Sequence, residues 1–358
     1  MPDGLYRILD ISSHVVHGYV GNRASTFPLQ LLEWDVDVLN TVAFSNHTGY
    51  MQWKGERATA SQIRDIYEGL KSNTLTDYDV ILSGYIPGAE AVREVGRVVE
   101  DLRRDQNDSP YGRDEIIWVL DPVMGDEDKL YVSPDVVPAY ESLLPLATVI
   151  TPNQFETELL TGTKLTSEAD IFTALTTLHN KFHTPNIIIS SAVPTGSGQQ
   201  SSSSGKGNDF ICAGQTFRSD GSACQFFLRL PFIDAYFTGT GDLFASMVAD
   251  KFFKHTRRCH ETYVSKNLTI PDHDLPLVRT LEDVSAIVQA VLRKTADAVA
   301  LYDKQAELAV KTLGVARPEK GTKERRIADM KHGELRLIQS QDAFKNTHTN
   351  VKAQFYSA

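Results

Sequence analysis

The sequence predicts an α/β fold in which a mainly parallel sheet is covered by helices on both faces. Strand-like and helix-like segments alternate through most of the 358 residues, which is typical of parallel sheets with helical connections. The predicted strands are short, continuous apolar runs, as expected for strands that are buried on both faces. They occupy residues 6–11, 80–82, 116–120, 148–150 and 187–189.

Helical segments between these runs repeat apolar residues at the spacing of one helix face. One such face is formed by Val92, Val95, Val98, Val99 and Leu102. Ser167, followed three residues later by Asp170, resembles a capping box at a helix start. Residues 209–217 and 225–233 predict two consecutive strands of a hairpin.

One domain spanning residues 1–358 is the expected organisation, because a chain of this length can bury a sizeable core. Three segments depart from the compact pattern and predict flexible insertions. Residues 195–208 are rich in Ser and Gly, residues 255–277 combine clustered charge with two prolines, and residues 318–331 are rich in Lys, Arg and Glu.

Composition limits the possible partners and compartments. Lys and Arg total 36 against 46 Asp and Glu, and a net charge of −10 disfavours sequence-independent nucleic-acid binding. The three cysteines form no Cys-x-x-Cys pair, which predicts free thiols in a reducing compartment. Neither a signal peptide nor a run of eighteen apolar residues is found. We therefore expect a cytoplasmic or nucleocytoplasmic protein that does not engage a membrane.

The most informative motif is Phe-Thr-Gly-Thr-Gly-Asp at residues 237–242, which leads directly into a helical run at residues 243–253. Gly239 and Gly241 allow a tight turn that exposes backbone N–H groups, and a helix N-terminus favours negative charge. Asp242 follows the turn and could accept a proton from a hydroxyl that attacks phosphorus. This interpretation predicts phosphoryl transfer to an alcohol. The alternative is that Asp242 simply caps the helix.

Polar residues also end five of the predicted strands. Because ligands of open α/β sheets bind beyond the carboxyl ends of the strands, these residues predict one shared site. The alternative is that each is a turn or cap residue, as any α/β protein requires. They are residues 12–14, 83–85, 121–122, 151–153 and 190–191.

Five sequence blocks together resemble the pyridoxal kinases of the ribokinase superfamily, from about Arg7 to Glu334-Leu335-Arg336. The blocks are residues 12–24, 44–50, 121–126, 151–156 and 239–242. The resemblance implies a ribokinase-like fold. It also implies transfer of the ATP γ-phosphate to the 5′-hydroxymethyl group of pyridoxal, pyridoxine or pyridoxamine. Mg²⁺ bound with ATP, a monovalent cation such as K⁺, and a homodimer are further implications.

The same resemblance assigns the reacting and vitamin-binding positions. Asp242 is the base, and Gly239, Thr240 and Gly241 surround the transferring phosphoryl group. Hydroxyl and imidazole groups would bond the substituents of the pyridine ring, and apolar side chains would contact its faces. These vitamin-binding positions are Ser13, Val20, Phe44, His47, Thr48 and Tyr85.

Nucleotide and cation positions are implied in the same way. The ATP-binding positions are Asp121, Asp126, Tyr131, Asn153, Glu156, Ser190, Ser191, Ile233, Asp234, Gly239 and Thr240. Asp121, Thr151, Glu156 and Ser190 are the positions beside the cations, and their oxygens suit hard cations. Residues 125–132 correspond to a flap over the phosphates.

Two alternatives remain open at this point. The first keeps the fold but replaces the acceptor by hydroxymethylpyrimidine, against which the set of Ser13, Thr48 and Tyr85 argues. The second is an idle relative that binds pyridoxal phosphate or a nucleotide as a sensor or carrier. Retention of Asp242 with both neighbouring glycines argues against that second alternative.

Overall fold

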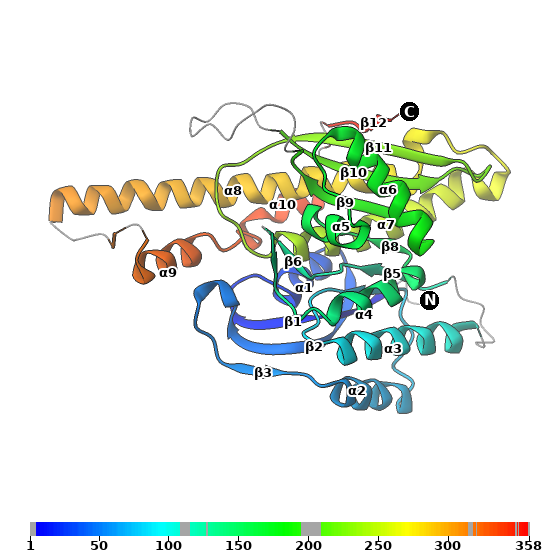
Figure 1. Ribbon diagram of the computed structural model, residues 1–358, viewed down its shortest axis with the longest axis horizontal. Helices are drawn as coiled ribbons and strands as arrows, with labels where there is room; N and C mark the ends of the chain where they lie inside the picture. Colours follow the sequence, from blue (N-terminus) through cyan, green and yellow to red (C-terminus); the bar gives the residue numbers. More distant parts are fainter. Residues whose placement is uncertain are drawn as a thin grey trace.

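A ten-stranded sheet forms the centre of the computed structural model (Figure 1), which describes residues 5–107, 115–126, 128–194, 209–313, 318–319, 321–347, 349 and 351–356. From edge to edge the strands are β12 (Gln354–Phe355), β11 (Ala223–Pro231), β10 (Asp209–Phe217), β9 (Asn186–Ala192), β8 (Val149–Ile150), β5 (Ile117–Leu120), β4 (Val80–Ser83), β1 (Tyr6–His17), β2 (Trp34–Asn46) and β3 (Gly55–Arg57). The six strands from β9 to β2 pair in parallel, and antiparallel strands flank them on both sides. The predicted mainly parallel sheet is confirmed.

Helices pack on both faces of this sheet, as the sequence predicts. One face carries α2 (Ala60–Ser72), α3 (Ala89–Asn107), α4 (Val136–Leu143), α5 (Gln154–Thr161) and α6 (Glu168–Phe182). The opposite face carries α1 (Asn22–Leu31), α7 (Thr240–Thr262), α8 (Pro276–Leu313) and α10 (Gln341–Lys345). A separate ribbon of β6 (Gly125–Asp126) and β7 (Lys129–Leu130) follows β5.

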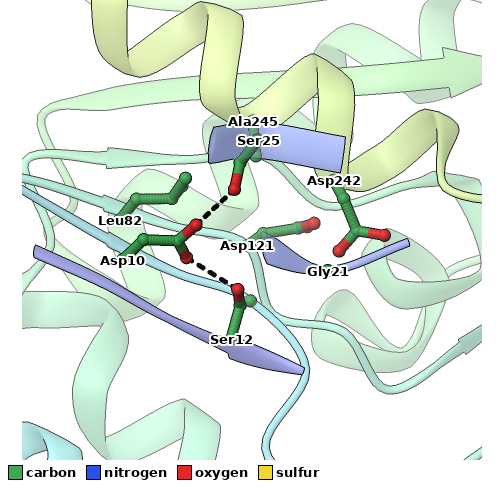
Figure 2. A pocket seen from close by; sticks show the side chains of 9 residues that line it. Asp10, Ser12, Gly21, Ser25, Leu82, Asp121, Asp242 and Ala245 are labelled. Carbon is green, nitrogen blue, oxygen red and sulfur yellow. Dashed lines mark hydrogen bonds between the residues drawn. The ribbon is translucent and has the colours of Figure 1, made fainter. Parts of the chain in front are cut away.

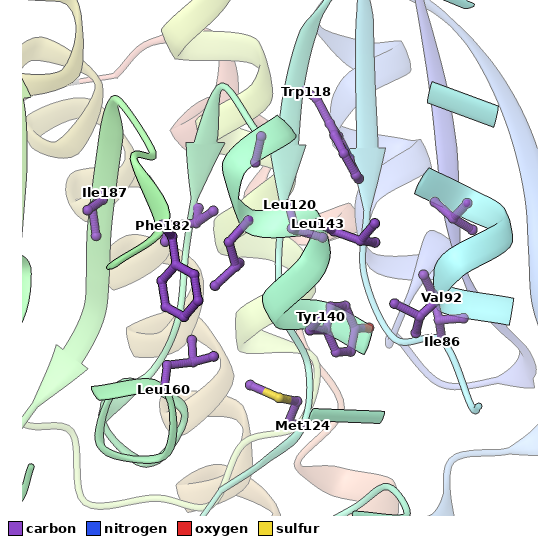
Figure 3. Close-up of a cluster of buried hydrophobic side chains, with 14 of the residues drawn as sticks. Ile86, Val92, Trp118, Leu120, Met124, Tyr140, Leu143, Leu160, Phe182 and Ile187 are labelled. Carbon is purple, nitrogen blue, oxygen red and sulfur yellow. The ribbon is translucent and has the colours of Figure 1, made fainter. Parts of the chain in front are cut away.

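Alternation along the strands divides the core into two layers, because successive side chains of a strand point to opposite faces. Ile81 packs toward the α3 and α4 layer, whereas its neighbours Val80 and Leu82 pack toward α7. Figure 3 shows part of the first layer, in which Trp118 and Leu120 of β5 belong to one cluster with Tyr140 and Leu143 of α4 and Val92 of α3. Both strand faces are therefore apolar, which explains the continuous apolar runs.

Local predictions agree closely with the elements. All five residues of the predicted helix face lie on α3 and are fully buried. Ser167 caps α6 and Asp170 completes the capping box. The predicted hairpin is the antiparallel pair of β10 and β11.

Two of the three predicted insertions are corrected by the structure. Residues 255–262 continue α7, because their charges lie on the solvent side of a helix whose other side buries Cys259. Short 3-10 turns at Val264–Lys266 and Asp272–Asp274 then lead to Leu275 and Leu277, which are buried.

Within residues 318–331, the Lys- and Arg-rich stretch forms α9 (Lys323–His332), whose first turn is capped by the Thr322 side chain. Met330 is buried and approaches Gly49 of the 3-10 turn η1 (Thr48–Tyr50), so this segment packs on the domain. The third predicted insertion, at residues 195–208, lies outside the described residues.

Even the 38-residue α8 lacks an apolar stretch of membrane-spanning length, as do the other helices of the described ranges.

Truncation of the α3 face tests the layer assignment. Leu102→Ala should lower the free energy of unfolding by about 2–5 kcal/mol, because the side chain is fully buried and its removal leaves a cavity. Urea denaturation provides the measurement, with Arg104→Ala as control. Arg104 lies on the same helix and makes an ion pair with Asp101 that is open to solvent, so its loss should change stability by about 1 kcal/mol or less. Equal effects would contradict the assignment.

Candidate active site

The glycine turn before α7 approaches the chain that follows β1 very closely. Gly239 is the N-cap of α7 with φ 78° and ψ 10°, a left-handed conformation that favours glycine. A Cβ atom at this position would clash with the backbone carbonyl of Tyr19. Because Gly239 is the cap residue, Asp242 is not the N-cap, and the helix-cap alternative is excluded.

Asp242 lies in the first turn of α7 with its carboxyl group turned toward the turn after β1. The backbone N–H of Gly21 donates to this carboxylate. Burial raises the pKa of Asp242, and the hydrogen bonds from the N–H groups of Gly21 and of Asp242 itself partly offset that rise. A carboxylate that is held in one orientation and has a raised pKa is suited to accept a proton.

The turn that supplies this hydrogen bond is itself packed against β1. Gly21 is the N-cap of α1 with φ 54°, and a Cβ there would clash with the backbone carbonyl of Ser13. The pairing of β1 with β2 shifts register between Ser12 and Ser13, so the strand is irregular where the turn rests on it. Ser13 and Asp242 are thereby fixed on either side of Gly21.

A small cavity at this point is lined by three carboxyl groups from different parts of the chain (Figure 2). Asp10 comes from β1, Asp121 follows β5, and Asp242 comes from α7. Burial is the main reason that the pKa of each is raised, and repulsion from Asp242 also raises those of Asp10 and Asp121. This concentration of buried negative charge is suited to cations or to donors of hydrogen bonds.

Asp10 is fully buried and is held by two serine hydroxyls. Its Oδ1 accepts a hydrogen bond of 2.6 Å from Ser12 Oγ, and its Oδ2 accepts one from Ser25 Oγ on α1. Burial raises the pKa of Asp10 to about 6, although both hydroxyls act in the opposite direction. The network therefore ties β1 to the helix that begins at Gly21.

Asp121 and Thr151 lie at the ends of neighbouring strands, as the sequence predicts. Asp121 donates its N–H to the carbonyl of Ser83, and Thr151 donates its N–H to that of Leu120. The Thr151 hydroxyl is buried without a well-oriented hydrogen-bond partner, although it is near enough to lower the pKa of Asp121 slightly. Such an oxygen beside a buried carboxylate fits a hard cation.

Asn153 and Glu156 form the capping box of α5 and also hold the base of the predicted flap. Glu156 Oε1 accepts the N–H of Met124 at 2.9 Å, and Oε2 accepts the N–H of Asn153. Asn153 Nδ2 donates to the carbonyl of Gly125 at 2.8 Å. Burial raises the pKa of Glu156 to about 8, despite these N–H donors. The pair thus positions the β6–β7 ribbon over the edge of the sheet.

The predicted apolar contacts to the vitamin come together in one cluster. Val20 and Tyr85 are half-buried and pack against the buried Phe44 beside Val15 and Val42. Thr48 begins η1, directly after the buried His47. Ser13 is buried at the register shift of β1. Ser13 packs against the Gly21 turn that approaches Asp242, so this cluster lies on the β1 and β2 side of that turn.

The remaining predicted positions lie outside the carboxylate cavity. Tyr131 is 58% exposed at the end of the flap and donates its N–H to the carbonyl of Met124. Ser190 lies within β9 and donates to the carbonyl of Pro152. Four further predicted nucleotide positions are exposed or half-buried outside this cavity, namely Asp126, Ser191, Ile233 and Asp234.

Several residues of the site were not singled out from the sequence. Asp10 interrupts the apolar run at residues 6–11, and a charged residue inside a buried strand is a signal that could have been used. Gly21 belongs to the block that carries the family resemblance and Ser25 directly follows that block, yet neither received a role. Glu334 marked only the end of that resemblance.

The donors present fit a magnesium ion that arrives with ATP better than a resident metal. The described residues contain no group of three or more His, Cys, Asp or Glu side chains placed to hold a metal. Mg²⁺ commonly binds one or two carboxylates together with substrate phosphates, and Asp121 and Glu156 could take part in such an arrangement. Bound there, the ion would neutralise charge that develops on the phosphates.

The fold and the site define a small-molecule kinase of the ribokinase type. The family model described as Phosphomethylpyrimidine kinase matches residues 110–263. Pyridoxal kinase of Sus scrofa is 42% identical over 259 residues, which cover 70% of this chain and 76% of that protein. Pyridoxal kinase of Arabidopsis thaliana is 35% identical, and the match covers 100% of this chain and 97% of that protein.

A solved structure extends the likeness to three dimensions. Pyridoxal kinase from Leishmania donovani in complex with ADP and pyridoxine matches with a TM-score of 0.75 at 28% identity, covering 98% of this chain and 99% of that one. The chain belongs to the pyridoxal kinase family of the ribokinase superfamily. The predictions of the ribokinase-like fold and of an ATP-dependent pyridoxal kinase are confirmed.

Substitution of Gly239 tests the close approach to Tyr19. Gly239→Ala should lower turnover on the order of 100-fold, because the new Cβ forces the start of α7, with its N–H groups and Asp242, away from the turn after β1. ADP release gives the measurement. Gly221→Ala is the matched control, because Gly221 also has a positive φ (81°) but no atom within 4 Å of the added Cβ. Comparable losses of turnover in both variants would contradict the contact argument.

Asp10 should leave a signature in the pH dependence of stability. Its pKa is about 6 in the folded protein against 3.8 for an unperturbed aspartate, so between these pH values the folded state binds a proton that the unfolded state does not. The free energy of unfolding therefore falls as pH rises from about 4 to 7, by about 3 kcal/mol for this group. Urea denaturation of wild type and Asp10→Asn at both pH values isolates the effect. Parallel pH profiles would count against a buried, titrating Asp10.

Proposed function

We propose that this pyridoxal kinase uses Asp242 as the base that accepts the proton of the 5′-hydroxyl group during phosphoryl transfer. The observation that carries the proposal is the placement of Asp242 in the first turn of α7, oriented by the Gly21 N–H. An alcohol has a high pKa, so the proton moves as the bond to phosphorus forms. Orientation of the hydroxyl and stabilisation of charge then supply most of the acceleration.

The backbone at the start of α7 holds the transferring group in this proposal. N–H groups of Gly239, Thr240 and Gly241 are unpaired at a helix N-terminus, where the helix dipole also favours anions. Asp121 and Thr151 lie beside the phosphates and their cations, and Ser190 completes the oxygen donors. The buried Thr151 hydroxyl without a well-oriented partner supports a monovalent cation such as K⁺ at this point.

The vitamin lies on the β1 and β2 side. Phe44, Val20 and Tyr85 contact the pyridine ring, since these three side chains form one apolar cluster beside Ser13. Hydroxyls of Ser13 and Thr48, with His47, bond the ring substituents. On the opposite side the nucleotide contacts Asn153, Glu156, Ser191, Ile233 and Asp234. Asp126 and Tyr131, from the β6–β7 flap, cover the phosphates and restrict water.

The oligomeric state and the cellular location are also part of the proposal. We propose a homodimer, which rests on the family resemblance. We also propose a cytoplasmic location, which extends to the nucleus if the protein is nucleocytoplasmic. The free, buried thiols of Cys212, Cys224 and Cys259 support it, because free thiols are expected in a reducing compartment.

Turnover with defined acceptors tests the assignment. Wild type should release ADP from Mg-ATP in the presence of pyridoxal, pyridoxine or pyridoxamine, and faster with K⁺ than with a tetraalkylammonium salt. Asp242→Asn should lower kcat by about 10²–10⁴, because it keeps the acceptor for the Gly21 N–H but loses the base. Asp220→Asn, an exposed carboxylate in the β10–β11 turn, serves as control.

Two outcomes would overturn this assignment. Full activity in Asp242→Asn would exclude the base, whatever the acceptor. Hydroxymethylpyrimidine as the preferred acceptor would instead support the alternative substrate, towards which the family model of residues 110–263 points.

A further inference from the structure

A buried carboxylate near the C-terminal end of the chain reaches both segments of the vitamin side. Glu334 follows α9 and is 4% exposed. Its Oε2 accepts the backbone N–H of Tyr19 at 2.8 Å, and its Oε1 accepts the Tyr50 hydroxyl at 3.0 Å. His47 Nε2 lies 3.3 Å from the same Oε1. One side chain thus joins segments that are about 300 residues apart in sequence.

The charge of Glu334 is compensated where it lies. Burial alone would raise the pKa of this carboxyl group. Contacts with His47, the Tyr19 N–H and the Tyr50 hydroxyl outweigh burial and lower the pKa below its usual value. Glu334 is therefore ionised at neutral pH and attracts each of these donors.

The backbone around Glu334 is shaped for close contact. Gly18 has φ 100°, and a Cβ there would lie 2.5 Å from Glu334 Oε1, so only glycine lets the carboxylate pack onto this turn. A Cβ at Gly333 would lie 3.2 Å from the carbonyl oxygen of Tyr236, in the loop before the phosphoryl-binding turn. The 333–334 segment therefore touches the vitamin side and the loop that leads to Gly239.

Tyr19 connects these contacts to the reacting atoms. The backbone N–H of Tyr19 donates to Glu334, and the carbonyl oxygen of Tyr19 is the atom that Gly239 approaches. Val20, which follows Tyr19, belongs to the apolar cluster with Phe44 and Tyr85. Thr48 likewise follows His47 and precedes Tyr50 in η1. The Tyr19 N–H and the Tyr50 hydroxyl thus flank the proposed vitamin contacts Val20 and Thr48, whereas His47 is itself a proposed vitamin contact.

We propose that Glu334 is a positioning residue of the vitamin-binding side, which holds the 18–20 turn and η1 at the correct distance from the Gly239 turn. This inference rests on the proposed function, because it takes Val20, Thr48 and the Gly239 turn as parts of the site. Glu334 itself does not contact the substrate. Its loss loosens the vitamin side and leaves the nucleotide positions on α5 and β9 in place.

Calorimetric titration of pyridoxal and of ADP tests the inference without depending on turnover. Glu334→Ala should raise the Kd for pyridoxal about tenfold or more and change the Kd for ADP less than twofold. Glu334→Gln should restore most of the pyridoxal affinity, because an amide keeps the shape and one acceptor. Tyr50→Phe removes a single donor and should give a smaller increase in the same direction.

Glu282→Ala provides the matched control. Glu282 is a carboxylate of equal burial, 3% exposed, whose partners are Arg279, Lys352 and Ala353. The Glu282→Ala substitution should lower the melting temperature without changing the Kd for pyridoxal or the Kd for ADP. Should Glu334→Ala fail to fold, Tyr50→Phe carries the test, because Glu334→Gln is expected to resemble wild type. A selective rise in the pyridoxal Kd in Tyr50→Phe supports the proposal.

Three results would overturn the proposal. They are unchanged pyridoxal affinity in Tyr50→Phe and in Glu334→Ala where that variant folds, equal weakening of pyridoxal and ADP binding, or an equal pyridoxal effect in Glu282→Ala. Turnover of wild type is followed in parallel. Selective loss of pyridoxal binding in an enzyme that releases no ADP would refute the catalytic assignment while supporting the role of Glu334.

Discussion

The site depends on one backbone contact, the approach of Gly239 to the carbonyl of Tyr19. This contact sets the distance between the start of α7, where anions are favoured, and the turn that follows β1. A side chain on Gly239 would separate the two. The Gly21 N–H, which orients Asp242, belongs to the same turn as Tyr19. Moving this turn would therefore displace the proposed base as well as the proposed vitamin contact Val20.

The sequence predicted those parts of the structure in which local pattern and burial agree. Apolar runs such as residues 187–189 are strands because both of their faces are covered, and the α3 face is apolar because one layer of the core rests on it. Residues 239–242 were recognised because the glycine turn before a helix agreed with the polar strand ends and with the other blocks of the family resemblance, whereas alone it also fits a helix cap. Charge clustering misled at residues 255–262, since an amphipathic helix shows the same clusters on its solvent side.

Contacts between distant segments could not be predicted in this way. Glu334 acquires its partners only when the chain after α9 returns to Tyr19 and Tyr50, and no periodicity in the sequence records that return. Asp10 did carry a signal, a charge inside an apolar strand, but its partner Ser25 lies on another element. The proposed nucleotide positions Ile233 and Asp234 rest on resemblance, because the structure brings neither to the carboxylate cavity.

Asp10 and Glu334 hold the same turn by opposite electrostatic means. Asp10 has only hydroxyl donors and faces Asp242, so burial dominates and its pKa rises. Glu334 has a backbone N–H, a phenol and an imidazole, which together outweigh burial, so its pKa falls. Ionised Glu334 therefore attracts its partners, whereas ionisation of Asp10 is opposed by its surroundings. The turn is therefore held by an ionised carboxylate where it meets the proposed vitamin side, and near the proposed base it lies beside a carboxyl group whose ionisation is opposed.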